Sequence, residues 1–73
     1  MMKLNPHALR AIREAHGITL TELGEACDLS LAMMSRIESG ERPAQVPTIR
    51  RLAVTLGVPV LALAQIDEEA DDV

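Results

Sequence analysis

The stretch at 19–42 reads TLTELGEACDLSLAMMSRIESGER, and it decides the fold. It opens with a helix start signal. Thr19 and Glu22 have the spacing of a capping box, in which the threonine oxygen accepts one free backbone amide and the glutamate side chain reaches back to another. The first part of the stretch therefore predicts a short helix at 20–27.

A second start signal follows at once. Ser30 can accept a hydrogen bond from the first turn of the next helix, and Gly40 suits the left-handed conformation that ends a helix. These residues predict a second helix at 31–39, with a corner at 28–30. The apolar residues expected to face a shared core are Ile18, Leu23, Cys27, Leu29, Met34 and Ile37. Two short helices joined in this way form a helix-turn-helix, whose second helix can lie in a DNA major groove.

The rest of the chain is expected to be helical too. Further helices are predicted over 6–16, 46–56 and 59–65. Asn5 and Pro6 start the first of these well, because asparagine caps and proline suits the first helical position. Residues 1–4 are expected to form a short arm, and no strand is predicted. The fold class is therefore all-α, a compact domain of five helices with the helix-turn-helix at the second and third.

Charge is distributed unevenly along the chain. The net charge is −4, but residues 67–73 (DEEADDV) hold five of the eleven acids. Residues 1–66 carry seven bases and six acids, a net charge of +1. We therefore expect a domain at 1–66 that can approach DNA phosphates and an acidic, disordered tail at 67–73. Whether the tail is only solvated or also competes with phosphates for arginines is left open.

Several other functions are disfavoured by composition. Phe, Tyr and Trp are absent, so no aromatic platform for single-stranded nucleic acid is available. Cys27 is alone, and His7, His16 and Cys27 lack the spacing of a metal site. No acid–base pair accompanies a nucleophile, so neither an enzyme nor a cofactor is expected. No apolar run is long enough to cross a membrane, and the chain is expected to be cytoplasmic.

Three segments resemble the XRE family, the DNA-binding domains of the phage lambda repressor and Cro type. They read LRAIREAHGITLTELGEACDLS at 9–30, MSRIESGER at 34–42 and TIRRLAVTLGV at 48–58. Two positions depart from the family pattern. Leu20 stands where the family commonly has glutamine, and Asp28 stands where the corner is commonly glycine.

The resemblance implies a dimeric regulator that binds double-stranded DNA at a pseudo-palindromic operator. It implies base contacts from Leu31, Ala32, Ser35 and Arg36. It implies phosphate contacts from Thr21, Ser30, Ser39, Arg42 and Gln45. Of the exposed arginines outside this set, Arg10 is also expected to contact a phosphate. Arg13 and Glu38 occupy the positions of a structural ion pair in the family. Arg50 and Arg51 are expected to be solvated.

Two features leave alternatives open. Leu31 and Met33 could contact thymine methyl groups or a protein partner. The apolar run at 59–65 could form a homodimer interface, through Val60, Leu61, Leu63 and Ala64, or could simply close the monomer core. The favoured function is a sequence-specific DNA-binding transcriptional regulator, with repression favoured over activation and a connection to phages or toxin–antitoxin systems left open. The alternative is a protein-interaction module on the same fold.

Overall fold

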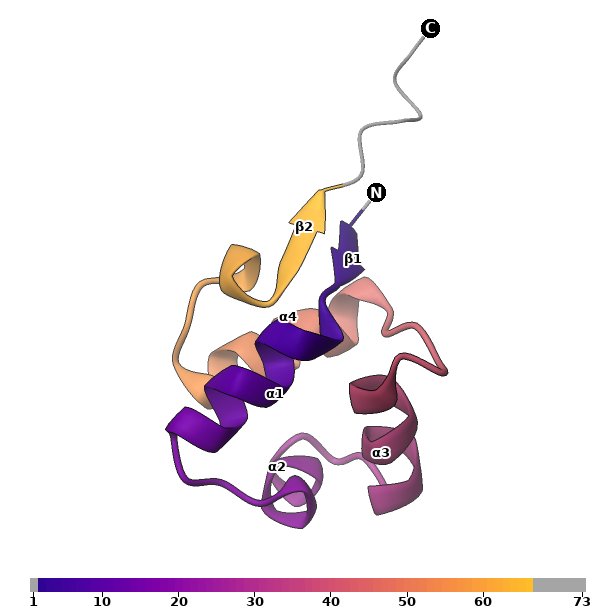
Figure 1. Cartoon of the computed structure of the whole chain (residues 1–73), viewed down its shortest axis with the longest axis vertical. Coiled ribbons are helices and arrows are strands. Elements are labelled where there is room, and N and C mark those ends of the chain that lie inside the picture. The colour runs from indigo at the N-terminus through magenta and orange to yellow at the C-terminus, as the bar shows by residue number, and fades with distance from the viewer. Residues whose placement is uncertain (1, 67–73) are drawn as a thin grey trace, which may run out of the picture.

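The computed structural model describes residues 2–66 (Figure 1). In chain order, the elements are the strand β1 (Met2–Leu4), the helices α1 (Pro6–Ala15), α2 (Leu20–Ala26), α3 (Leu31–Ser39) and α4 (Val46–Leu56), the 3-10 turn η1 (Val60–Ala62) and the strand β2 (Ala64–Ile66). The helices α2 and α3 lie at one end of the molecule, and the two strands lie at the other. None of the helices within residues 2–66 has the length and apolar character needed to cross a membrane.

The start signals of the helix-turn-helix work as predicted. The Thr19 hydroxyl accepts the Glu22 backbone N–H at 3.0 Å, and the Glu22 carboxylate accepts the Thr19 N–H at 2.9 Å. Ser30 accepts the Met33 N–H at 3.1 Å, and Gly40 ends α3 with a φ of 84°. The predicted bounds of α3 and α4 are confirmed, and α1 and α2 each end one residue earlier than predicted.

The corner between α2 and α3 depends on a close backbone approach. The Leu29 N–H donates to the Gly24 carbonyl at 2.8 Å. A Cβ at Gly24 would lie 2.8 Å from the Leu29 carbonyl oxygen and 3.0 Å from Met34 Cγ, so only glycine fits there without a shift. Asp28 has a φ of 63°, the left-handed conformation that explains why the family commonly has glycine at this position.

The predicted helix at 59–65 is wrong. Only Val60–Ala62 forms a 3-10 turn, and the chain then extends into β2, which pairs antiparallel with β1. The expected arm is thus a strand, and the domain has four α-helices within the described residues rather than five. The reason is long-range pairing: Met2 pairs with Ile66, and the Asn5 N–H donates to the Leu63 carbonyl at 2.8 Å. Backbone bonds to a distant segment replace the bonds that a helix would have made locally.

The core is aliphatic and draws on every helix. Its fully buried large side chains are Leu9, Leu23, Met34, Ile49, Leu52, Leu63 and Cys27. Leu63, which follows η1, therefore closes the monomer core together with Ala64. This packing fixes α3 from behind and leaves its other side at the surface.

Candidate nucleic-acid interface

One side of α3 forms an exposed stripe. All four residues predicted to contact bases, Leu31, Ala32, Ser35 and Arg36, are exposed, whereas Met34 and Ile37 are buried. The spacing explains this division, because residues three and four apart share a face of a helix. The structure therefore brings the predicted base-contacting residues together on one surface, which we call the α3 stripe.

An ion pair holds α3 in place from the inner side. Arg13 of α1 donates to both Glu38 carboxylate oxygens, at 2.7 Å from Nε and 2.9 Å from Nη2. Its third nitrogen donates to the Ile18 carbonyl at 2.8 Å. The hydrogen bonds to Glu38 raise the pKa of the Arg13 guanidinium above its ordinary value, against the opposing effect of burial. The predicted structural pair is confirmed, and it ties α1, the loop before α2 and the end of α3 together.

The hydroxyls predicted to meet phosphates differ in what they can still donate. Ser39 already donates its hydroxyl proton to the Arg36 carbonyl at 3.1 Å. Ser30 only accepts, from the Met33 N–H, so its proton stays available to a phosphate oxygen. Thr21 is exposed in the first turn of α2, and its side chain has no hydrogen-bond partner within residues 2–66. Within residues 2–66, the hydroxyl protons of Ser30 and Thr21 are therefore unused, whereas that of Ser39 is already donated.

Two further predicted phosphate residues lie in the loop between α3 and α4. Arg42 and Gln45 are exposed, and neither side chain has a partner within the described part of the chain. Gln45 stands at the N-cap of α4 without making a capping bond, so its amide remains free to donate. Arg36 of the α3 stripe likewise makes no side-chain bond or ion pair within residues 2–66.

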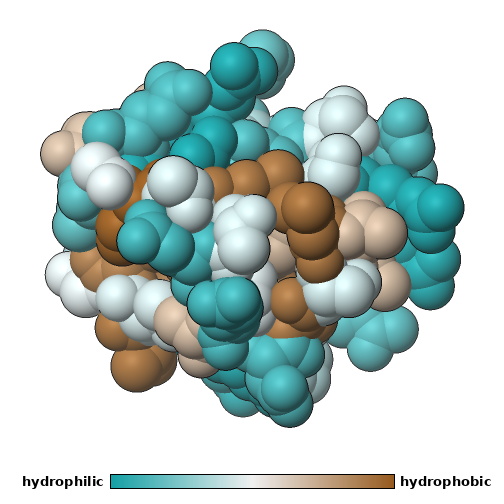
Figure 2. Space-filling model, turned by 90° about the horizontal axis from the view of Figure 1, so that it is seen from below, coloured by the Kyte–Doolittle hydropathy of each residue, from teal (hydrophilic) through white to brown (hydrophobic). Residues whose placement is uncertain are grey.

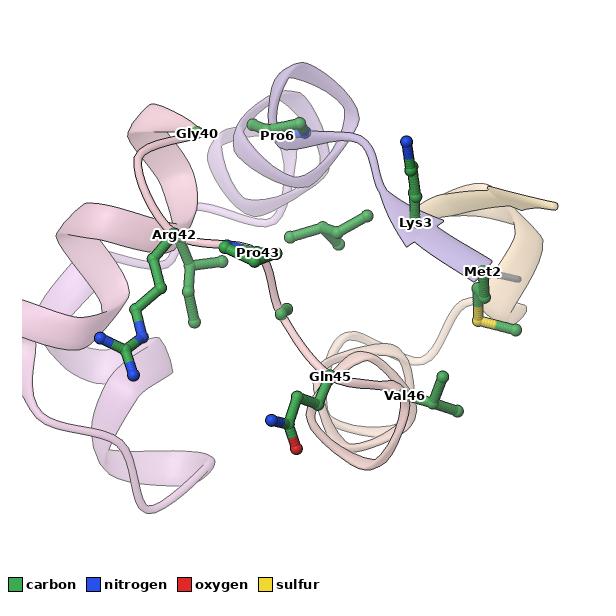
Figure 3. A pocket seen from close by; sticks show the side chains of 11 residues that line it. Met2, Lys3, Pro6, Gly40, Arg42, Pro43, Gln45 and Val46 are labelled. Atoms are coloured by element: carbon green, nitrogen blue, oxygen red, sulfur yellow. The ribbon is translucent and has the colours of Figure 1, made fainter. Parts of the chain in front are cut away.

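A groove of about 630 Å³ runs between this loop and β1. Figure 3 shows Pro43 between Arg42 and Gln45 on one wall, with Met2 and Lys3 on the opposite wall. Most of the lining is apolar, and no lining residue is acidic: Met2, Lys3, Leu4, Pro6, Ile37, Gly40, Arg42, Pro43, Ala44, Gln45 and Val46. The loop that carries Arg42 is therefore bordered by the groove on the side of β1.

Two further arginines, Arg10 of α1 and Arg51 of α4, make contacts within the domain. Arg10 pairs with Glu14 at 3.1 Å on the exposed side of α1, which leaves its phosphate contact a prediction. Arg51 is exposed, as expected, and its guanidinium also donates to the Cys27 carbonyl at 3.0 Å, which caps the end of α2. The sequence offered no signal for this contact, because α2 and α4 are separated by α3.

The apolar residues at the front of α3 do not form one patch. Leu31 is 52% exposed, whereas Met33 is half-buried and packs against the core. Residues two apart lie about 200° around a helix, so the two side chains point to different sides. Figure 2, which views the molecule from the α2 and α3 end, shows apolar groups dispersed among polar ones. The surface at this end of the molecule is therefore of mixed polarity, and within residues 2–66 it carries no broad apolar patch.

The predicted dimer residues separate into two groups. Leu63 and Ala64 are buried in the monomer, with Ala64 6% exposed, so their side chains are unavailable to a partner. Leu61 is 62% exposed and Val60 is half-buried. Since the segment is not a continuous helix, its apolar residues do not line one helical face.

No group of histidine, cysteine and acidic side chains within residues 2–66 could hold a metal ion.

The geometry of the predicted DNA-contacting residues defines a class of protein: a helix-turn-helix whose second helix presents an exposed stripe and whose flanking loops present donors. The sequence profile of the helix-turn-helix domain family matches residues 7–66. The chain belongs to this family, and it is an XRE-like helix-turn-helix DNA-binding domain, as the resemblance predicted.

Two known regulators illustrate the similarity. The chain is 42% identical over 52 residues to the HTH-type transcriptional repressor RghR of Bacillus subtilis (strain 168). That match covers 70% of this chain but only 38% of RghR, so the chain spans well under half of that repressor. Two crystal structures of the clp gene regulator ClgR from Corynebacterium glutamicum match with TM-scores of 0.73 and 0.74, both at 32% identity. These matches cover 77% of this chain and 73% and 60% of the two ClgR chains.

Proposed function

We propose that the chain acts as the sequence-specific DNA-binding part of a transcriptional repressor, with α3 in the major groove of double-stranded DNA. The observation that carries this proposal is the α3 stripe, on which Arg36 is exposed and has no partner within residues 2–66. The similarity to RghR supports repression as the outcome of binding.

The chemistry of the α3 stripe supports a particular kind of site. A guanidinium can donate two hydrogen bonds to guanine O6 and N7, while leucine and alanine can contact only the thymine methyl group. Arg36 is the stripe's only charged residue among the four predicted base contacts. We therefore expect Arg36 to carry most of the base discrimination, about 1–3 kcal/mol, with Leu31 and Ala32 favouring thymine.

Phosphate contacts and symmetry complete the proposal. Exposed hydrogen-bond donors flank α3 in the chain: Thr21 and Ser30 precede it, and Arg42 and Gln45 follow it. We propose that two copies bind a pseudo-palindromic operator, with half-sites about 10 bp apart. Arg10 and Ser39 are weaker candidates for phosphate contacts, because each side chain already donates a hydrogen bond within the domain.

The test compares two arginine variants on a site selected from a random duplex pool. Arg36→Ala should weaken binding to the selected site by about 5- to 150-fold, the equivalent of 1–3 kcal/mol, while binding to unrelated DNA changes little. Arg50→Ala is the matched control, because Arg50 is an exposed arginine of α4 outside the α3 stripe. Equal losses on selected and unrelated DNA would show that Arg36 contacts a phosphate and does not read a base.

A second candidate is a protein-interaction module. The exposure of Leu31 and the net charge of −4 favour it. Salt separates the two functions, because each phosphate that the protein neutralises makes the slope of log affinity against log salt concentration more negative by about 0.9. A slope near zero for any DNA binding that occurs would favour the protein-interaction module.

A further inference from the structure

The backbone carbonyl of Arg36 collects hydrogen bonds from the end of α3 and the loop that follows it. Its oxygen accepts the Glu41 N–H at 2.9 Å, the Arg42 N–H at 3.2 Å and the Ser39 hydroxyl at 3.1 Å. Gly40, with a φ of 84°, turns the chain back so that these amides reach the carbonyl. The bond from Glu41 belongs to the usual ending of a helix at a left-handed glycine. The bonds from Arg42 and Ser39 are additional to that ending.

The hydroxyl of Ser39, the last residue of α3, lies between the helix and the loop. It donates to the Arg36 carbonyl, and its oxygen accepts the Glu41 N–H at 3.4 Å. A hydroxyl can donate and accept at the same time, so this one side chain connects the last turn of α3 to the first amide after Gly40. The next amide, that of Arg42, bonds to the same carbonyl.

The loop is also held at its far end. Ala44 is half-buried and packs against the core. Pro43 has a fixed φ and restricts the backbone of the residue before it, which is Arg42. Figure 3 shows Arg42 and Pro43 in succession along this loop. The Arg42 guanidinium, in contrast, has no partner within residues 2–66. The backbone of Arg42 is therefore fixed, while its charged group is available to a ligand.

The Arg36 carbonyl thus joins two side chains with different predicted roles. The Arg36 guanidinium is predicted to contact a base and the Arg42 guanidinium a phosphate. Phosphate contacts fix the register and orientation of a protein on the duplex, and base contacts read the sequence. Holding the Arg42 backbone on the Arg36 carbonyl therefore fixes the position of the base-reading side chain relative to the phosphate.

We propose that Ser39 is a positioning residue, whose hydroxyl holds the loop that carries Arg42 against the Arg36 carbonyl, so that Arg42 meets a phosphate while Arg36 lies at the base edges. The family resemblance gave Ser39 a phosphate contact of its own, and the proposal replaces that contact. It rests on the proposed function, because it requires DNA on the α3 stripe.

Hydrogen exchange of the free protein tests the positioning of the loop without DNA. In Ser39→Ala, the Glu41 and Arg42 amides should exchange about 2- to 10-fold faster, the change expected from one lost hydrogen bond. Alanine is a better helix former than serine, so helix propensity alone would act in the opposite direction. Ser35→Ala is the matched control. It makes the same substitution on the exposed side of α3, removes no side-chain hydrogen bond within residues 2–66, and should leave both amides unchanged.

DNA binding tests whether Ser39 acts through Arg42. On the site selected from the random duplex pool, Ser39→Ala should weaken binding about 2- to 10-fold. In a chain that already carries Arg42→Ala, the same substitution should change the affinity by less than about 1.5-fold, because the group that Ser39 positions is gone. Ser39→Thr keeps a hydroxyl at this exposed position and should bind as the unmodified chain does.

The salt dependence separates positioning from a direct contact. A serine hydroxyl neutralises no phosphate charge, so losing a direct contact from Ser39 would leave the slope of log affinity against log salt concentration unchanged. Losing the Arg42 contact makes that slope less negative by about 0.9. The proposal predicts that Ser39→Ala shifts the slope part of the way toward that of Arg42→Ala, although it removes no charge.

Equal losses from Ser39→Ala with and without Arg42, together with an unchanged slope, would show that Ser39 contacts a phosphate itself and would overturn the proposal. Unchanged exchange of the Glu41 and Arg42 amides would overturn it as well, whatever the DNA result. A chain that selects no DNA site but shows the faster exchange would contradict the proposed function, and it would support the part of the proposal that concerns the loop.

Discussion

The ion pair between Arg13 and Glu38 gives the sharpest stability prediction. Both side chains are largely buried, 12% and 9% exposed, and they meet through two hydrogen bonds of 2.7 and 2.9 Å. Glu38→Gln removes the negative charge, keeps the shape of the side chain and leaves the Arg13 charge buried without its partner. Removing one member of a buried pair typically costs 3–5 kcal/mol. The glutamine oxygen can keep one hydrogen bond, so we expect about 3 kcal/mol.

That loss is a large part of the total, because a domain of this size is stable by roughly 5 kcal/mol. Urea unfolding followed by circular dichroism suits the measurement, since the chain has no tryptophan or tyrosine for fluorescence. With a denaturant slope of about 1 kcal/mol/M, the midpoint should fall by roughly 3 M. The double variant Arg13→Met with Glu38→Leu should recover most of this loss, because it leaves no buried charge unpaired.

Arg10→Gln is the matched control for this prediction. It breaks an ion pair of 3.1 Å between Arg10 and Glu14, whose side chains are 65% and 55% exposed. Exposed pairs four apart on a helix contribute only about 0.3–0.5 kcal/mol. If Glu38→Gln costs no more stability than Arg10→Gln, the buried pair does not fix α3.

The contribution of the Arg13 charge to the free energy of unfolding should stay constant across neutral pH. The folded-state pKa of Arg13 is raised by its hydrogen bonds to Glu38. A raised pKa of a basic group means that its contribution is present in full below the unfolded pKa and is lost only as pH rises through the folded value. Both values lie in the strongly alkaline range, so the Arg13 charge is constant between pH 6 and 9.

Three further substitutions should change the midpoint of thermal unfolding, followed by circular dichroism. Gly24→Ala should lower stability by about 1–3 kcal/mol, because the added methyl group meets the Leu29 carbonyl. A gain in helix propensity of up to about 1 kcal/mol does not offset this loss. An unchanged midpoint would show that the corner can relax. Asp28→Gly should raise stability by roughly 0.5–1 kcal/mol by relieving the φ of 63°, and a lower midpoint would contradict this. Ser30→Ala should cost about 0.5–2 kcal/mol through loss of the cap on Met33, whereas Ser35→Ala, on the exposed side of the same helix, should cost little.

The helix-turn-helix could be predicted from sequence because its signals are local. Thr19, Glu22, Ser30 and Gly40 each act within one helical turn, and each makes the capping contact or adopts the conformation that its position indicated. The exposed stripe of α3 follows from helical spacing for the same reason. The family resemblance supplied what local signals could not, namely that Arg13 pairs with Glu38.

The structure of the segment at 59–66 could not be predicted, because it depends on contacts with a distant part of the chain. β1 and β2 contain three residues each, too few for an alternating pattern to be recognised. The residue pattern of the run VLALAQ is equally compatible with a buried helix and a buried strand, and pairing with β1 decides between them. The contact of Arg51 with the Cys27 carbonyl likewise depends on how α4 packs against α2. The predicted acidic tail lies outside the described residues.

The central claim is that the α3 stripe reads specific DNA sequences, and one measurement tests it most directly. Fragmented DNA from the source genome is incubated with the purified chain at two salt concentrations, and the bound fragments are sequenced. The claim predicts that a few sites sharing an inverted repeat are enriched at both concentrations, and that Arg36→Ala abolishes their enrichment. Uniform weak recovery that disappears at the higher salt, with no shared repeat, would contradict it.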